Sequence, residues 1–185
     1  MSLAEILGYV VERLDRAGIP HMISGSVASA HHGEPRSTQD VDLVIDPTVI
    51  ALATFVGSLD RERYYIDDAL EALERRSQCN VIDVTTGWKV DLIVVKDRPF
   101  SRVELARRQP LTLLGIGTFV ATVEDVILSK LEWSRASESE RQVRDVVAML
   151  RLRAGELDDA YLDRWARALD LVSVLDDARR SAANP

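Results

Sequence analysis

Apolar residues recur at helical spacing at the start of the chain and again over its last third. The first pattern runs from Leu3 to Leu14 and stops before Gly18, a residue type that commonly follows a helix end. Beyond Ala121 the same spacing predicts four more helices, at residues 122–134, 138–153, 158–169 and 172–180. The C-terminal third is therefore predicted to be a set of helices.

Between these helical regions, short apolar runs alternate with turn residues. One run, from His21 to Ser24, ends at Gly25-Ser26 and is followed by small residues that begin a helix. Further strands are predicted at 41–45, 80–85 and 88–95, a bent pair of strands within 111–120, and helices at 48–58, 67–77 and 99–108. The pattern indicates an α/β (α+β) protein. We expect a core over residues 1–121 and a C-terminal helical subdomain over residues 122–185.

The composition is that of a folded protein with an acidic surface. Of the 185 residues, 46% are apolar and 29% charged, and 23 Lys and Arg against 30 Asp and Glu give a net charge of −7. This charge excludes a globally basic nucleic-acid clamp. No apolar run approaches the ~18 residues of a membrane-spanning helix, and the single cysteine, Cys79, is typical of a reducing compartment. We therefore expect a cytoplasmic protein with no membrane partner.

The first candidate site residues are Asp40 and Asp42, at the start of the strand predicted at 41–45. Side chains at i and i+2 of a strand leave the same face, so these carboxylates are expected close together. Two like charges at that distance need a counter-charge, and carboxylate oxygens are ligands that Mg²⁺ prefers. The alternative is an ordinary solvated strand start.

A third acid, Asp91, interrupts the apolar run from Trp88 to Val95. If the hairpin turns on Thr86-Gly87, Asp91 lies opposite Ile82, and Asp83 lies on the other face of the sheet. Asp91 is thus preferred over Asp83 as the partner of the first two acids, and three carboxylates on neighbouring strands would hold two divalent ions. An edge-strand acid facing water is the alternative for Asp91.

Three segments in this order resemble the nucleotidyltransferase superfamily of DNA polymerase β type, and most closely its minimal nucleotidyltransferases and AbiEii-type toxins. The segments are Gly25-Ser26, Arg36-Ser37-Thr38-Gln39-Asp40-Val41-Asp42-Leu43 and Lys89-Val90-Asp91-Leu92. The resemblance implies a mixed sheet flanked by helices. It also implies that Gly25 and Ser26 bind a triphosphate, that Asp40 and Asp42 bind two Mg²⁺ ions, with Mn²⁺ as a substitute, and that Asp91 ligates one of them.

Further residues are candidates for the nucleotide. The resemblance to AbiEii-type proteins assigns Lys130 and Asp145, on successive C-terminal helices, to triphosphate contact and its orientation. Asp145 could alternatively act as a base, and both residues could belong to a solvated helix face. Arg36, in the loop before Asp40, could reach a phosphate, although a lone arginine before a strand usually faces water.

These features predict transfer of a nucleoside monophosphate from a nucleoside triphosphate (NTP) to an acceptor hydroxyl, with release of pyrophosphate. The acceptor stays open among a protein side chain, a tRNA end, an antibiotic and a small metabolite. A toxin would also have an antitoxin partner. Two alternatives are a non-catalytic module of the same fold that binds a nucleotide or a partner, and a haloacid-dehalogenase-like phosphatase. The phosphatase is disfavoured because the apolar run follows the paired acids instead of preceding them.

Overall fold

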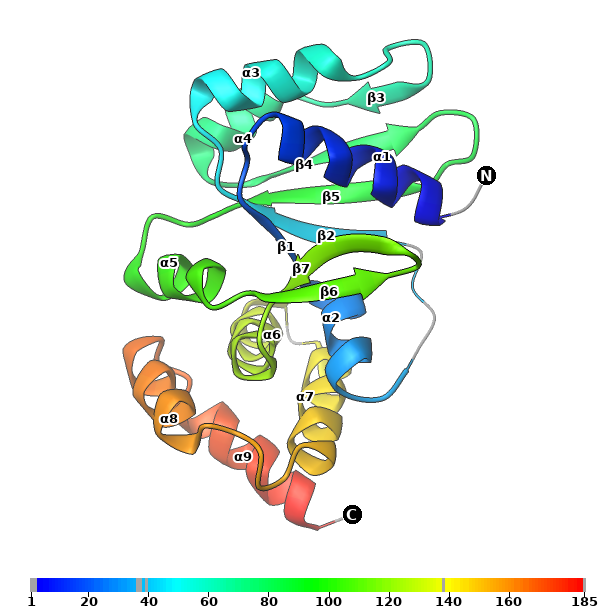
Figure 1. The fold of residues 1–185 in the computed structure, drawn as a ribbon. Coiled ribbons are helices and arrows are strands. Elements are labelled where there is room, and N and C mark those ends of the chain that lie inside the picture. The colour runs from blue at the N-terminus through cyan, green and yellow to red at the C-terminus, as the bar shows by residue number, and fades with distance from the viewer. Residues whose placement is uncertain (1–2, 36–37, 39, 138, 185) are drawn as a thin grey trace. The chain divides into compact units, whose positions relative to one another are not determined.

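The computed structural model describes residues 3–35, 38, 40–137 and 139–184, and the chain in it separates into two compact units (Figure 1). Met1–Ser24 and Thr38–Ala121 form the first, here called the sheet unit, and Gly25–Ser37 and Thr122–Pro185 form the second, here called the helical unit. The segment after the first strand thus belongs with the C-terminal helices. Within the described residues, no helix is both long and apolar enough to cross a bilayer.

The sheet unit is built on a mixed sheet of seven strands in the order β3-β4-β5-β2-β1-β7-β6. Strands β2 and β5 are parallel, as are β1 and β7, and the other neighbours are antiparallel. The mixed α/β architecture predicted from the sequence is therefore confirmed. The strands are β1 His21–Ile23, β2 Asp40–Ile45, β3 Tyr64–Ile66, β4 Gln78–Asp83, β5 Lys89–Val94, β6 Gln109–Leu113 and β7 Ile116–Val120.

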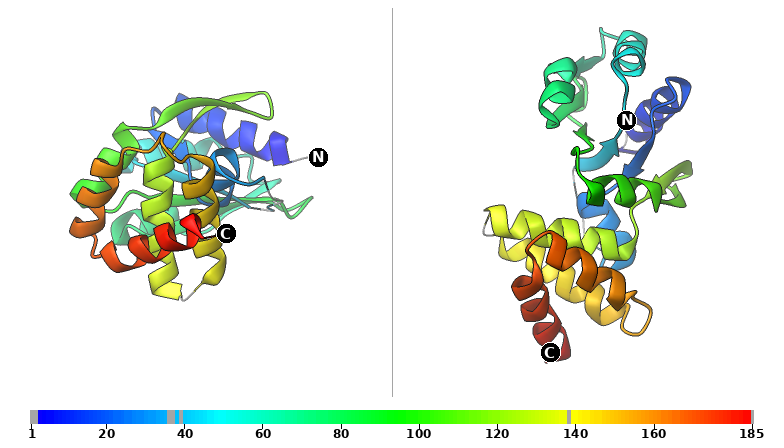
Figure 2. Two further views of the ribbon diagram at one scale, coloured as in Figure 1. Left: turned by 90° about the horizontal axis from the view of Figure 1, so that it is seen from below. Right: turned by 90° about the vertical axis from the view of Figure 1, so that its left-hand side faces the viewer.

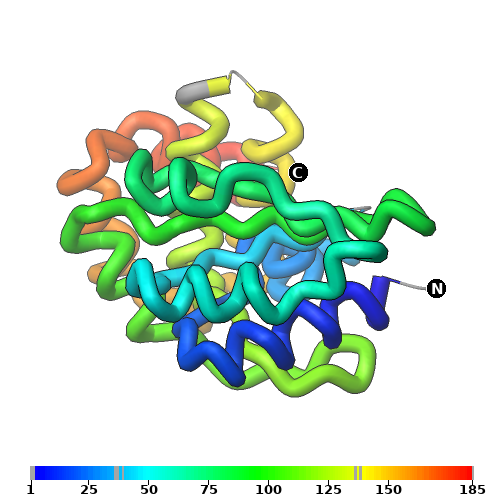
Figure 3. The backbone as a smooth tube through the Cα atoms, turned by 90° about the horizontal axis from the view of Figure 1, so that it is seen from above, coloured from blue at the N-terminus to red at the C-terminus, as the bar shows by residue number. Residues whose placement is uncertain are grey.

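Of the helices of the sheet unit, α1, α3 and α4 cover one face of this sheet (Figure 1). The alternate side chains of β2 and β5 on that face are at most 1% exposed, namely Val41, Leu43, Ile45, Val90, Leu92 and Val94. Helix α1 packs on β5 and β7, and Figure 3 shows it running alongside α3. The acids of β2 and β5 alternate with these apolar residues, so they lie on the opposite face. The helices are α1 Leu3–Arg16, α3 Val49–Ser58, α4 Ala69–Arg75 and α5 Pro99–Ala106.

The helical unit packs helix α2 against two C-terminal helices, α6 and α7, which lie side by side in Figure 2. Its helices are α2 Gly25–His32, α6 Val123–Ser137, α7 Glu140–Leu152, α8 Asp159–Ala168 and α9 Val172–Ala183. At Gly33, directly after α2, a Cβ would approach both Met149 and the Ser29 carbonyl to 3.0 Å. A glycine at this position therefore permits the close approach of α2 and α7.

The predicted register of the β4–β5 hairpin is wrong by two residues. Asp91 pairs with Asn80, whereas a turn at Thr86-Gly87 would place it opposite Ile82. The turn is wider because the Asp83 carboxylate accepts hydrogen bonds from the amides of Thr85 and Thr86. A shift of two residues keeps every side chain on its face, so Asp83 and Asp91 do lie on opposite faces of the sheet.

Two other details also differ from expectation. Strand β3, at Tyr64–Ile66, pairs with β4 in a region where no strand was predicted. Helix α2 begins at Gly25 itself, before the small residues that were expected to start it. Both differences concern short elements with little apolar periodicity, three residues in β3 and eight in α2.

Candidate active site

Four charged residues of β2 and β5 share the sheet face opposite the helices, here called the acidic face. In the parallel pairing of the two strands, Asp42 lies beside Asp91 and Asp40 lies beside Lys89. Because paired residues on neighbouring strands point the same way, all four side chains leave the same face. The structure thus brings Asp40, Asp42 and Asp91 together on adjacent strands.

Lys89 brings a positive charge to this face. Its Nζ lies 3.0 Å from Oδ2 of Asp91 and 3.7 Å from Oδ1 of Asp40. Partial burial lowers the pKa of Lys89, but the hydrogen bond and charge of Asp91, followed by those of Asp40, outweigh it and leave the pKa above its ordinary value. Lys89 is therefore held as an ammonium between acids of two strands. The sequence reasoning missed this role, although the alternation Lys89-Val90-Asp91 already places Lys89 and Asp91 on one face.

Asp91 carries a carboxylate oxygen with no partner among the described residues. The residue is only 7% exposed; its Oδ2 accepts from Lys89, while its Oδ1 is buried without a hydrogen bond. Leaving such an oxygen unsatisfied is costly, and a bound cation or a hydrogen-bond donor would satisfy it. Three carboxylates form the kind of oxygen donor set that a hard divalent cation takes.

The three acids are nonetheless not already arranged to coordinate a metal ion. Among the described residues, no group of three or more His, Cys, Asp and Glu side chains is arranged to hold a metal ion. Two of the three carboxylates, those of Asp40 and Asp91, instead lie near the ammonium of Lys89. A metal bound here would require these side chains to turn.

The Gly25-Ser26 turn directly follows Ser24, the first residue after β1. The Ser24 amide donates to the Asp42 carbonyl at 2.9 Å, and Gly25, with φ of +57°, opens helix α2 directly afterwards. Glycine adopts this left-handed conformation without strain. The first amides of a helix are unpaired within it and lie at the positive end of its dipole, so the start of α2 at Gly25 and Ser26 has donors of the kind that a phosphate accepts. Phosphate binding by these residues stays a prediction. Both residues belong to the helical unit.

Lys130 and Asp145 meet inside the helical unit. The ammonium of Lys130 on α6 donates to Oδ2 of Asp145 on α7 at 2.8 Å and to Oε1 of Gln142 at 2.7 Å. The Ser29 hydroxyl of α2 donates to the same oxygen of Asp145 at 3.3 Å. Lys130 is only 3% exposed, so this pair joins three helices instead of forming a solvated helix face. Its predicted contact with a triphosphate stays a prediction.

The sequence also raised two further residues, Arg36 and Asp83. Arg36, the candidate phosphate ligand, lies outside the described residues. Asp83 is on the helix-covered face, 1% exposed, and its Oδ2 accepts from Arg63 at 3.0 Å. Asp83 is therefore bound within the fold and is not part of the acidic face.

Comparison with solved structures identifies the fold. The crystal structure of an antigenic nucleotidyltransferase-like protein from Paracoccidioides brasiliensis matches with a TM-score of 0.59 and 19% identity, over 97% of this chain and 92% of that one. The solution structure of the antibiotic-resistance factor ANT(2'')-Ia matches with a TM-score of 0.57 and 12% identity, over 91% and 96%. The fold is that of the nucleotidyltransferases.

A third similar structure is that of the lincosamide antibiotic adenylyltransferase LnuA, solved with lincomycin bound. LnuA matches with a TM-score of 0.55 and 11% identity, over 80% of this chain and 96% of that one. No family model and no curated protein matches the sequence. The structural similarity establishes the nucleotidyltransferase fold. At identities this low, the narrower resemblance to AbiEii-type toxins stays a prediction.

Proposed function

We propose that this protein is a metal-dependent nucleotidyltransferase. The observation that carries the proposal is the convergence of Asp40, Asp42 and Asp91 on one face of two parallel strands within a nucleotidyltransferase fold. In the reaction, the oxygen of an acceptor hydroxyl attacks the α-phosphorus of an NTP. The bond from that phosphorus to the bridging oxygen breaks, pyrophosphate leaves, and the hydroxyl proton is released to solvent.

The acidic face would supply the metal ligands. Asp42 and Asp91 lie side by side, Asp40 is next on the same face, and the buried Oδ1 of Asp91 has no hydrogen-bond partner among the described residues. Two bound Mg²⁺ ions, or Mn²⁺ in their place, would lower the pKa of an attacking hydroxyl and neutralise the leaving pyrophosphate. The three carboxylates would balance the charge of these ions.

Residues of the helical unit would bind the triphosphate. The amides at the start of α2 and the hydroxyl of Ser26 are hydrogen-bond donors of the kind that phosphate oxygens accept. We assign to Lys130 and Asp145 the role of orienting helix α2, because Asp145 accepts a hydrogen bond from Ser29 of that helix. Arg36 keeps its proposed phosphate contact on the basis of the sequence alone.

A small-molecule hydroxyl is the acceptor class to test first. ANT(2'')-Ia has been solved in complex with adenylyl-2''-tobramycin and LnuA with lincomycin, so two proteins of this fold carry antibiotics. A protein side chain and a tRNA end come next, and a toxin role with an antitoxin partner would follow only from the AbiEii-type resemblance.

A non-catalytic nucleotide-binding module is the second candidate. The observation that favours it is Lys89, whose ammonium already neutralises acids that a metal would otherwise bind. In such a module, NTP binding would need no divalent metal. The two candidates therefore differ in a measurable way.

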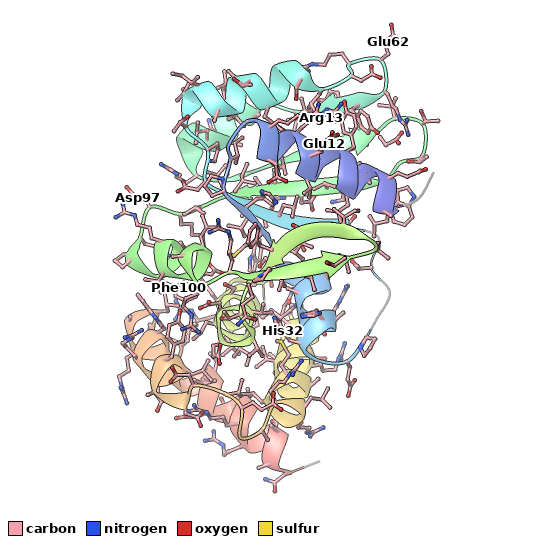
Figure 4. All side chains as sticks on the ribbon, in the orientation of Figure 1. Glu12, Arg13, His32, Glu62, Asp97 and Phe100 are labelled. Atoms are coloured by element: carbon pink, nitrogen blue, oxygen red, sulfur yellow. The ribbon has the colours of Figure 1, made fainter. Side chains whose placement is uncertain are left out.

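The experiment follows transfer of an α-labelled NTP to acceptors in the presence of Mg²⁺, with pyrophosphate release as a second readout. We expect product with wild type and at least a hundredfold loss in Asp42→Asn, as for removal of an essential charged group. Asp97→Asn is the matched control, because Asp97 is exposed, pairs with Arg102 and loses the same charge (Figure 4).

Equal NTP binding by all three proteins with and without Mg²⁺, and no transfer, would instead establish the binding module. Release of free phosphate from phosphomonoesters would indicate the phosphatase.

A further inference from the structure

Lys89 occupies an unusual place for a lysine in a sheet. It lies beside Asp40 in the strand pairing and two residues before Asp91 on its own strand, so its ammonium reaches carboxylates on both strands. Its side chain is 36% exposed, whereas that of Asp91 is 11% exposed. The cation thus sits at the solvent side of a carboxylate that is itself largely buried.

We propose that Lys89 is a built-in counter-ion that a divalent metal must displace from Asp40 and Asp91. The inference rests on the proposed function, because it concerns the affinity of the same acidic face for metal. Lys89 then sets how much metal, or metal-bound nucleotide, is needed to load the site. It also keeps three neighbouring carboxylates compatible with a folded sheet when no metal is bound.

The electrostatics of the face support displacement over permanent pairing. A lysine ammonium carries one charge on a long flexible chain, whereas a divalent ion brings two charges to the same oxygens. Because the side chain is partly exposed, the ammonium can move into water without being buried unpaired. A partly solvated pair of this kind is weak, so its loss should change metal affinity by about three- to tenfold.

Removing the ammonium has two effects of opposite sign. Without metal, Asp40 and Asp91 lose their shared counter-charge and repel each other and the neighbouring Asp42, so the fold becomes less stable. With metal, the competitor is gone, so the ion binds more tightly. A purely structural ion pair would show the first effect without the second, and a lysine that binds phosphate would show weaker NTP binding without tighter metal binding.

The test compares wild type, Lys89→Met and Lys96→Met. Lys96 is the matched control, because it lies beyond the end of β5 at Val94 and its replacement removes the same charge from the same unit. Mn²⁺ binding is measured by electron paramagnetic resonance and Mg²⁺ binding by calorimetry, at low ionic strength, with thermal melts at zero and saturating metal.

We expect Lys89→Met to bind Mn²⁺ about three- to tenfold more tightly than wild type, and Lys96→Met to stay within about twofold, as for an exposed charge at a distance. Lys89→Met should melt below wild type without metal and recover the difference at saturating metal. Suppose that wild type binds Mn²⁺ and Asp42→Asn does not. If Lys89→Met then binds Mn²⁺ no more tightly than wild type, only the proposed role of Lys89 is overturned. If Mn²⁺ binding that Asp42→Asn abolishes is found neither in wild type nor in Lys89→Met, the metal-dependent function and this inference are both overturned.

Discussion

The Lys130 ammonium lies 2.8 Å from Oδ2 of Asp145 inside the helical unit, and the two side chains are 4% and 14% exposed. Gln142 accepts a hydrogen bond from Lys130, and Ser29 donates one to Asp145. Charges removed from water to this extent are compensated mainly by each other. The pair therefore fixes the packing of α2, α6 and α7 whether or not a nucleotide is bound.

Replacing Lys130 with Met should destabilise the protein by about 3 kcal/mol, because it leaves the Asp145 carboxylate without its buried counter-ion. The free energy of unfolding from urea titrations measures the loss. The double replacement Lys130→Met with Asp145→Leu should recover most of it, since no buried charge then remains unpaired. A single replacement that costs less than about 1 kcal/mol would mean that the pair behaves as a surface ion pair.

Alternation along the strands was sufficient to predict that Asp40 and Asp42 share a face and that Asp83 and Asp91 do not. Both relations follow from a period of two residues, which survives an error in register provided the shift is even. The pairing of β2 with β5 is a contact between distant segments, and nothing local in either strand specifies it. Lys89 is missed for a different reason. Carboxylates at this spacing indicate metal ligands, and the same carboxylates can instead accept hydrogen bonds from a lysine ammonium.

The missed elements depend on tertiary structure. Strand β3 is three residues long, and its apolar residues Tyr64 and Ile66 enclose an exposed Tyr65, which is too short a pattern to detect. The grouping of α2 with the C-terminal helices depends on contacts such as that of Gly33 with Met149. Such contacts leave no periodic signal in the sequence.

Asp83 should make stability depend on pH. Burial raises the pKa of its carboxyl, but the amides of Thr85 and Thr86 and the guanidinium of Arg63 lower it by more, so the net pKa lies below its usual 3.8. The folded state therefore favours the ionised form. This contribution is fully present above pH 3.8 and is lost as the pH falls through the lowered value in the folded protein.

Asp83→Asn should accordingly cost about 2 kcal/mol at pH 7, since it removes charge-assisted hydrogen bonds while Arg63 can turn to water. The difference from wild type should shrink as the pH is lowered from 7 to 2.5, measured as free energy of unfolding at each pH. A difference that stays constant over this range would show that the carboxylate's charge contributes nothing. Metal binding at the acidic face should be unaffected, because Asp83 lies on the other face.

Cys79 should be inert in the native protein. It is 1% exposed on β4, and burial, followed by the charges of Asp67, Asp68 and Asp91, raises the pKa of its thiol to about 12. Because the thiolate is the reactive form, reaction with a disulfide reagent at pH 8 should be slower than in the unfolded chain by on the order of a thousandfold. Absorbance of the released thiol with and without urea measures this ratio. Rapid reaction without urea would mean that β4 opens readily.

Leu114 occupies a backbone conformation that disfavours it. The β6–β7 hairpin closes through Leu114 and Gly115, with φ of +52° and +82°, between the paired residues Leu113 and Ile116. Both central residues thus have the positive φ of a type I′ turn, for which Asn-Gly is the preferred sequence. The Leu114 side chain is 59% exposed, so it gains little burial in return for that strain.

Leu114→Asn should therefore stabilise the protein by about 1 kcal/mol, because asparagine tolerates the left-handed conformation that costs other residues roughly this much. Thermal melts and urea titrations would detect the gain. Gly115→Ala is the control of opposite sign: no atom lies within 4 Å of a Cβ at that position, so its expected loss of about 1 kcal/mol comes from the backbone alone. If Leu114→Asn is instead destabilising while Gly115→Ala behaves as expected, the leucine side chain makes a contact that outweighs its strain.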